Sequence, residues 1–306
     1  MINLSTNCNE FFENSENDLL MIYGAGTNAE IIVDLMKKVN IKIECVIDND
    51  IKKSNHFFNG IKILAPNDVE NLYKNNKKKI LVTSNRLLSC IHTIESNITN
   101  VSVYIPKQEM DIESFNAAIA PLRHKLLKTE DFTIIANTCD GTRIYQLLNC
   151  NYNTPFIGNI IKPNDFYKLC SNLKYYMKQE LKFVRIEEWM YPNKPYVLCT
   201  LGDIEIKFIS RVDFDYIKQK WDERVKRMNY ENLFFIWEDF HYETSYDIYE
   251  KFLNIPYGKK LIFQRGKQIS GLKHSIYDPD KSLFSPGYLV EKWFNLIGFI
   301  NNEVEY

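Results

Sequence analysis

A glycine turn near the N-terminus constrains the fold more than any other feature of this sequence. The apolar run Leu19–Tyr23 stops at Gly24-Ala25-Gly26, and a helical pattern begins at once. With Ala29 in the third position the turn reads G-x-G-x-x-A, a variant of the dinucleotide-binding fingerprint. A second strand ends in Asp48, at about the spacing where an acid meets a ribose hydroxyl. The sequence therefore predicts a Rossmann-like strand–turn–helix that faces a nucleotide.

Strands alternate with helical patterns along most of the chain, which predicts an α/β protein with parallel sheets. We expect a small Rossmann-like, nucleotide-binding parallel-sheet domain and then a second, different α/β domain. In the first domain, Val101–Ile105 is expected to be the edge strand. The predicted division is a polar N-terminal segment over 1–17, the Rossmann-like domain over 18–105, a helical connector over 106–129 and the second domain over 130–306.

Charge and cysteine content narrow the functional class. Of 306 residues, 38 are basic and 39 acidic, so no overall charge attracts nucleic acid. The polar N-terminal segment lacks the apolar stretch of a signal peptide, and no apolar run is long enough for a transmembrane segment. The seven cysteines are odd in number and form no C-x-x-C pair. We expect a cytoplasmic protein without disulfides; no pattern indicates an oligomeric state.

The glycine turn supplies the first candidate site. Backbone N–H groups at the turn and the positive helix end would face a pyrophosphate. Thr83 and Ser84 follow a later strand and would lie beside the turn if that strand neighbours the first; equally, they would cap a helix. A tight turn without a ligand is the alternative for the whole motif. The predicted nucleotide-binding residues are Gly24, Gly26, Asn28, Asp48, Thr83 and Ser84.

Candidate catalytic residues lie in the second domain. Cys139 sits in a polar turn before a helix, an arrangement similar to a nucleophile elbow, although a packing thiol is the alternative. Glu238 and Asp239 follow a buried strand, where either would serve as a general base or metal ligand. Their alternative role is that of helix N-terminal acids. No histidine cluster supports a metal site, so none is predicted.

Candidate substrate-binding residues come from two segments. Asn137 and Arg143 flank the turn at Cys139 and would hold an anionic group or a sugar. Arginines recur at three-residue steps after Trp221 on a charged helix, where they would grip phosphate; the alternative is a solvated face paired with its own acids. The predicted substrate-binding residues are Asn137, Arg143, Trp221, Arg224, Arg227 and Asn229.

Residues 21–105 resemble the N-terminal nucleotide-sugar-binding domain of bacterial sugar acyltransferases. The resemblance is carried by Tyr23-Gly24-Ala25-Gly26, by Val46-Ile47-Asp48-Asn49-Asp50 and by the short strand Asn59–Leu64. It implies a uridine nucleotide held at Gly24, Gly26 and Asp48. No hexapeptide repeats of a left-handed β-helix follow, so acyl transfer on that scaffold is excluded.

Residues 132–263 are similar to a bacterial family known as exopolysaccharide biosynthesis proteins, which has no established reaction. The matching segments are Asn137–Gly141, Tyr152–Pro155, Trp221–Asn229 and Asn232–Phe234, with the acid pair Glu238-Asp239. Where that family tends to have His-Tyr, this chain has Ser210-Arg211. The resemblance implies a place in surface-polysaccharide synthesis rather than a chemistry.

Together these patterns predict an enzyme of surface-polysaccharide biosynthesis that binds a nucleotide sugar, with a UDP-sugar favoured, and transfers a group to or from a glycan. The first alternative is a nicotinamide-dependent oxidoreductase, in which Asp48 would select NAD over NADP. The second is a non-catalytic nucleotide-sugar-binding or scaffold protein. No nucleic-acid partner is expected.

Overall fold

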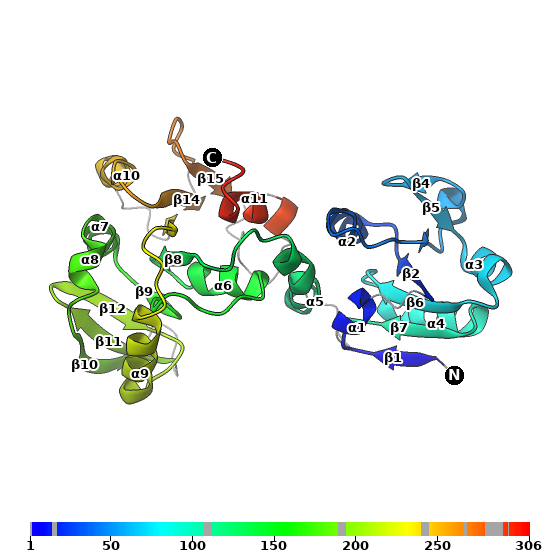
Figure 1. The fold of residues 1–306 in the computed structure, drawn as a ribbon, viewed down its shortest axis with the longest axis horizontal. Helices are drawn as coiled ribbons and strands as arrows, with labels where there is room; N and C mark the ends of the chain where they lie inside the picture. Colours follow the sequence, from blue (N-terminus) through cyan, green and yellow to red (C-terminus); the bar gives the residue numbers. More distant parts are fainter. Residues whose placement is uncertain are drawn as a thin grey trace. The chain divides into compact units, whose positions relative to one another are not determined.

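The computed structural model confirms an α/β fold and divides the chain into two compact units (Figure 1). The first comprises Met1–Leu127, Leu147–Asn149 and Pro286–Lys292, and the second comprises the remainder. The residues that the structure describes are 2–13, 17–106, 112–188, 194–239, 245–265, 268–278, 290–292 and 294–306.

The first unit is built on a seven-stranded sheet in the order β1-β7-β6-β2-β3-β5-β4. All neighbouring strands are parallel except the short β4, which pairs antiparallel with β5. The central strands are buried because they are apolar on both faces, as helix-covered parallel strands are. The strands are β1 Asn3–Ser5, β2 Asp18–Tyr23, β3 Cys45–Ile47, β4 Phe57–Phe58, β5 Ile61–Leu64, β6 Lys77–Val82 and β7 Val101–Tyr104.

At its borders this unit includes two segments that the predicted division placed outside the Rossmann-like domain. The N-terminal segment is not outside the sheet, because β1 pairs with β7 and is itself the edge strand. Phe11 and Phe12, in the short helix α1, are buried, which anchors this segment to the unit. The helix expected as a connector is α5, and it clusters with the first unit, where it contacts α1 and α2.

The residue pattern of α2, the helix after the glycine turn, explains why this part of the fold was predictable from the sequence. Its apolar residues recur on one face and are buried against the sheet. Asn40 follows it in the left-handed conformation (φ 59°), as expected of an Asn at a helix C-terminus. The helices of this unit are α1 Asn9–Phe12, α2 Thr27–Lys38, η1 Ile51–Lys53, α3 Pro66–Tyr73, α4 Leu87–Asn97, α5 Ile112–Lys125 and η2 Val290–Lys292.

The second unit contains two four-stranded sheets. One is parallel, in the order β15-β14-β13-β8, and the other is antiparallel, in the order β10-β11-β12-β9. A hairpin at Gly202 joins β11 to β12, and Gly202 has a φ of +62°. The strands are β8 Thr133–Ala136, β9 Asn159–Ile160, β10 Leu181–Glu188, β11 Pro195–Leu201, β12 Ile204–Phe208, β13 Leu233–Asp239, β14 Lys259–Arg265 and β15 Ser275–Asp278.

An aromatic-rich core joins these two sheets to helices of the unit. Trp237 on β13 packs edge-on against Phe166, Tyr249 and Phe252. Many of the chain's aromatic side chains therefore pack in this core. The helices that begin in this unit are α6 Asp140–Leu147, α7 Pro163–Ser171, α8 Leu173–Tyr176, α9 Phe214–Val225, α10 Tyr246–Leu253 and α11 Leu296–Ile300. Of the helices that the structure describes, none has the length and apolar character needed to cross a membrane.

Candidate functional site

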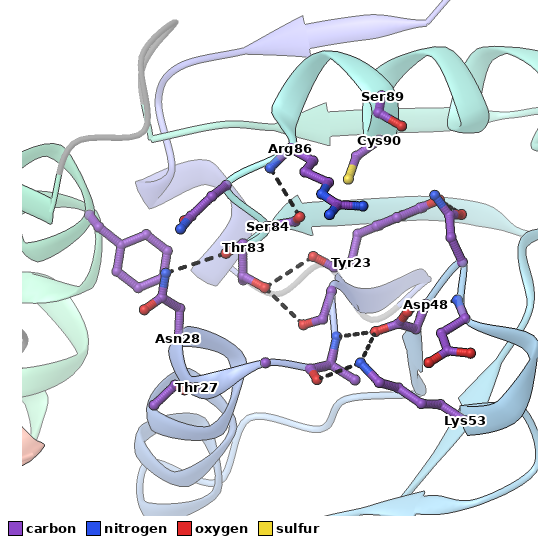
Figure 2. Close-up of a pocket in the computed structure, with 17 residues that line it drawn as sticks. Tyr23, Thr27, Asn28, Asp48, Lys53, Thr83, Ser84, Arg86, Ser89 and Cys90 are labelled. Carbon is purple, nitrogen blue, oxygen red and sulfur yellow. Dashed lines mark hydrogen bonds and ion pairs between the residues drawn. The ribbon is translucent and has the colours of Figure 1, made fainter.

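A cavity of about 940 Å³ opens in the first unit at the carboxyl ends of β2, β3 and β6 (Figure 2). From β2 the sheet continues through β3 and β5 toward one edge, and through β6 and β7 toward the other edge. The strand order therefore reverses between β2 and β6. Open α/β sheets bind ligands at such a point, outside the carboxyl ends of the strands.

The two glycines of the turn have different structural roles. Gly24 has a φ of +103°, and a Cβ there would lie 3.1 Å from Cβ of Ser84 and 3.2 Å from Oγ1 of Thr83. Gly26 has an extended backbone (φ −129°, ψ −175°) that any residue adopts, and a Cβ there would meet nothing within 4 Å. Gly24 is thus required by the turn itself, whereas Gly26 keeps open the approach to the start of α2.

The N-terminus of α2 lines this cavity through Thr27 and Asn28. Gly26 is its N-cap residue and has no side chain that could accept a hydrogen bond from the first backbone N–H groups. The amide of Asn28 reaches sideways to the carbonyl of Thr83 (3.4 Å) and ties the helix to the end of β6. The helix start is therefore uncapped by any side chain and carries the positive end of the helix dipole.

Asp48 braces the turn rather than pointing freely into the cavity. Its Oδ2 accepts from the backbone N–H of Ala25 (2.9 Å) and from Nζ of Lys53 (3.0 Å), and its Oδ1 accepts from the N–H of Asp50 (2.9 Å). Burial by itself would raise the pKa of Asp48, but these N–H groups and the ammonium lower it below its ordinary value. The carboxylate is thus held ionised, with lone pairs left for a ligand hydroxyl.

Thr83 and Ser84 lie beside the glycine turn, because β6 neighbours β2 as the prediction required. Oγ1 of Thr83 lies 3.0 Å from the carbonyl oxygens of both Tyr23 and Gly24. Oγ of Ser84 accepts from the N–H of Arg86 (3.2 Å). The N-cap of α4 is Arg86 without a side-chain cap, so neither hydroxyl is the helix cap considered as an alternative.

Two cations in the cavity wall were missed in the sequence analysis. Lys53 follows β3 and Arg86 follows β6, and Figure 2 shows both side chains among the residues that line the cavity. Lys53 also donates to the carbonyl of Ala25 (3.3 Å). The available signal was position: both residues come shortly after strands whose carboxyl ends were expected to meet. Both line the cavity into which the start of α2 opens, Lys53 as the ion-pair partner of Asp48.

In the second unit, the predicted residues Asn137 and Glu238 meet at the carboxyl ends of β8 and β13. Nδ2 of Asn137 donates to the carbonyl of Glu238 (2.9 Å), and its Oδ1 accepts from the N–H of Glu238 (2.7 Å). Oγ1 of Thr138 donates to Oε2 of Glu238 (2.5 Å). Asn137 thus faces the neighbouring strand. Glu238 and Asp239 are the last residues of β13 and are buried, so they are not helix N-terminal acids.

The structure does not support Cys139 as a nucleophile. Burial raises the pKa of its thiol to about 12, and the negative charges of Asp140 and Glu238 add to the effect. Its Sγ contacts the carbonyl oxygen of Asn159 at 3.9 Å. A nucleophilic cysteine needs the opposite conditions, a nearby positive charge and a lowered pKa. Arg143 lies one helical turn on, in α6, and its N–H donates to the carbonyl of Cys139 (3.1 Å).

The remaining predicted substrate-binding residues do not join this group, which corrects that prediction. Trp221 is 3% exposed and packs edge-on against Phe156 and Phe208, so it belongs to the core. Asn229 is a turn residue: its Oδ1 accepts from the N–H groups of Glu231 and Asn232, and its Nδ2 donates to the carbonyl of Asp131.

Arg224 and Arg227 lie toward the opposite end of the parallel sheet from Asn137. They come at the end of α9 and just after it, shortly before β13 begins, and the N–H of Asn229 donates to Oγ1 of Thr133 at the start of β8. The guanidinium carbon of Arg224 lies 5.3 Å from the centre of the Tyr152 ring. Burial, with the charge of Arg227, lowers the pKa of Arg224.

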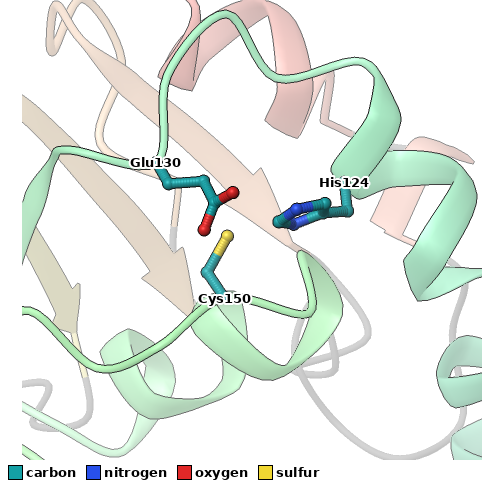
Figure 3. Close-up of side chains that lie close together, drawn as sticks. All are labelled: His124, Glu130 and Cys150. Carbon is teal, nitrogen blue, oxygen red and sulfur yellow. The ribbon is translucent and has the colours of Figure 1, made fainter.

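Three side chains of metal-ligating type are drawn in Figure 3, but they divide between the two units. His124 belongs to the first unit, where its Nδ1 lies 3.1 Å from the carbonyl oxygen of Leu148, and Glu130 and Cys150 belong to the second. Burial raises the pKa of Cys150 to about 12, and the charge of Glu130 adds to this. Because the three side chains belong to two different units, we assign no metal site to them.

Comparisons with known proteins describe both parts of the chain without naming a reaction. Residues 16–110 match a family model described as C2185-like, N-terminal, and neither family description names a polysaccharide or an acyltransferase. An uncharacterised protein of Haemophilus influenzae is 32% identical over 137 residues, which are 45% of this chain; the chain spans 63% of that relative. A pantoate–beta-alanine ligase structure from Francisella tularensis, with beta-gamma ATP and beta-alanine, covers 68% of this chain and 97% of its own. Its 13% identity and TM-score of 0.14 carry no argument.

The longer match covers most of the second unit. Residues 111–302, well over half of the chain, match the family model described as Domain of unknown function (DUF1919). The chain therefore belongs to the DUF1919 family.

Proposed function

We propose that the cavity of the first unit binds a nucleotide through its phosphates, with a UDP-sugar as the favoured ligand, and that the protein acts in surface-polysaccharide biosynthesis. The observation that carries the proposal is the uncapped start of α2, which lies open at Gly26 and shares its cavity with Lys53 and Arg86. Unpaired N–H groups, a helix dipole and two cations together suit a diphosphate.

The size and polarity of the cavity fit such a ligand. About 940 Å³ is near the upper end of the range for small-molecule pockets, which is about 300–1,000 Å³. Its wall carries hydroxyl and amide groups at Thr27, Asn28, Ser84 and Asn85 that suit a ribose or a sugar. The carboxylate of Asp48 keeps lone pairs for a ribose hydroxyl even while it braces the turn.

A sugar nucleotide is favoured over NAD because of the two sequence resemblances. Residues 21–105 resemble a nucleotide-sugar-binding domain, and residues 132–263 resemble exopolysaccharide biosynthesis proteins. Group transfer to or from a glycan is the reaction that this pairing suggests. Its candidate base is the carboxylate of Asp239 or Glu238 at the end of β13, where open α/β sheets place their reactive groups.

The test is calorimetric titration of the full chain with UDP-glucose, UDP-N-acetylglucosamine, UDP and NAD. The decisive variant is Gly26→Ser, because a Ser at this N-cap would accept from the N–H of Asn28 or Ala29 and fill the space that a phosphate needs. We expect the variant to be as stable as the natural protein but to bind UDP-sugars at least tenfold more weakly.

A matched control places the same cap on a helix away from the cavity. Ala65 is the N-cap of α3 and has no side-chain cap, so Ala65→Ser makes an equivalent change without touching the site. We expect it to bind as the natural protein does. Absence of binding by any nucleotide would refute the proposal. Binding by Gly26→Ser at natural affinity would refute the location, and binding of NAD alone would favour an oxidoreductase.

A further inference from the structure

The second unit has a surface whose composition is unusual for an edge strand. Strand β10 lies at the edge of the antiparallel sheet, beside β11 alone among the described strands. Three apolar side chains on it are strongly exposed: Phe183 (47%), Val184 (40%) and Ile186 (54%). An edge strand offers an unpaired row of backbone N–H and C=O groups, so exposed apolar side chains beside that row mark a surface for strand pairing.

A β-bulge determines which of these side chains share a face. Phe183 lies opposite Cys199 of β11 and Ile186 lies opposite Val197, with Val184 as the extra residue between them. Since Cys199 and Val197 are two apart, they point to the same face, and so do Phe183 and Ile186. Without the bulge, residues 183 and 186 would point to opposite faces. The bulge thus creates one apolar face along the strand.

The same register collects charges on the other face. Lys182, Arg185 and Glu187 lie opposite Thr200, Leu198 and Tyr196, which alternate with the residues of the apolar face. The basic residues come first along the strand, and the acidic residues Glu187 and Glu188 come last. In an antiparallel pair of identical strands, the basic start of one strand would lie opposite the acidic end of the other.

We propose that β10 pairs antiparallel with β10 of a second copy of this chain, with the two-fold axis between Val184 and Arg185. This register places Phe183 opposite Ile186 of the second copy on the apolar face. It also places Lys182 opposite Glu187 on the charged face. Each contact occurs twice because a two-fold interface is isologous. The pairing joins the two antiparallel sheets into one continuous sheet and covers the exposed apolar pair.

The complementarity is what selects a second copy as the occupant. A strand of arbitrary sequence would match the apolar residues but would not also place opposite charges against both Lys182 and Glu187. The centre of the Phe183 ring lies 5.5 Å from that of Phe214 at the start of α9, so a contact within the same chain holds Phe183 on the apolar face. The surface involves no residue of the nucleotide cavity, so this inference is independent of the proposed function.

Sedimentation velocity of the full chain, from about 1 µM to about 1 mM, covers the range over which a modest interface is measurable. We expect a monomer–dimer equilibrium. Lys182→Glu sets like charges opposite each other at two symmetric positions and should raise the dimer Kd about tenfold or more. The double variant Lys182→Glu with Glu187→Lys exchanges the charges across the interface and should lower the Kd again relative to Lys182→Glu, although it also removes the ion pair of Glu187 with Arg185 in the same chain. Lys178→Glu makes the same charge change outside β10 and should leave the Kd unaltered.

The apolar face is tested separately with Ile186→Lys, which should abolish the dimer because it buries a charge opposite Phe183. Far-UV circular dichroism and thermal melting show whether each variant is folded. A natural protein that stays monomeric up to the highest concentration would overturn the proposal. So would a dimer that withstands Ile186→Lys in folded protein, or a charge exchange that fails to lower the Kd relative to Lys182→Glu.

Discussion

Replacement of Gly24 by Ala is the sharpest test of how the glycine turn is built. At φ +103° an L-residue is strained, whatever space surrounds it. The new Cβ would also lie 3.1 Å from Cβ of Ser84 and 3.3 Å from its backbone nitrogen, closer than ordinary van der Waals contact. Because one of these atoms is backbone, the end of β6 would have to shift to relieve the contact.

The magnitude follows from two opposing terms. A residue held in a sparsely populated backbone region costs about 1–3 kcal/mol. Loss of glycine's freedom in the unfolded chain returns about 0.4–1 kcal/mol. With the added steric contact, we expect a net loss of about 2 kcal/mol in the free energy of unfolding of the first unit. For a unit of this size that corresponds to a fall in Tm of roughly 5–10 °C.

The assay is differential scanning calorimetry of Gly24→Ala beside Gly26→Ala. Gly26 has an extended backbone and open space around its Cβ position, so its only cost is that of Ala at an N-cap, about 1 kcal/mol or less relative to Gly. Two glycines two residues apart should therefore differ clearly in Tm. Equal melting temperatures for the two variants would refute the assignment of separate roles to Gly24 and Gly26.

Three further predictions concern other residues of the candidate sites. Trp221→Ala should lower the free energy of unfolding by about 3–5 kcal/mol, because the Trp221 side chain is buried in the core. A urea titration that shows no loss of stability would contradict this burial. In native protein at pH 8, Cys139 should react with iodoacetamide at least about tenfold more slowly than an exposed thiol of ordinary pKa, because burial raises its pKa to about 12. Rapid labelling, followed by mass spectrometry, would contradict this. Asp48 has a lowered pKa in the folded state, so its stabilisation is complete above the unfolded value near 4 and is lost as the pH falls through the folded value. The Tm difference between natural protein and Asp48→Asn should therefore be largest above about pH 5 and shrink below about pH 4, and a difference that grows in acid would contradict the hydrogen bonds assigned to Asp48.

The cavity of the first unit was partly predictable because its main elements are local. The strand, the glycine turn and the start of α2 occupy one short segment, and φ requirements act on single residues such as Gly24 and Asn40. Lys53 and Arg86 were not found, because each follows a different strand and only strand order brings their side chains to one cavity. The pairing of β1 with β7 was missed for the same reason, since the partners are about 100 residues apart.

The predicted site of the second unit was separated by the direction of its strands. Helix α9 precedes β13, so its C-terminal end, with Arg224, comes to the amino end of the sheet. Asn137 and Glu238 stand at the carboxyl ends of β8 and β13. Residues that were predicted to bind one substrate therefore lie at different ends of one sheet. Strand direction, rather than residue type, decides which side chains can act together.

The sequence by itself determined the α/β class and the position of the glycine turn, because hydrophobic periodicity and glycine turns are properties of short segments. Only the tertiary structure decided that Asp48 holds the turn, that Trp221 is buried and that the bulge in β10 gives Phe183 and Ile186 a common face. Each of these depends on a partner far along the chain or on a strand register. A short sequence pattern specifies neither the distant partner nor the strand register, because many pairings of the same elements bury the same apolar residues.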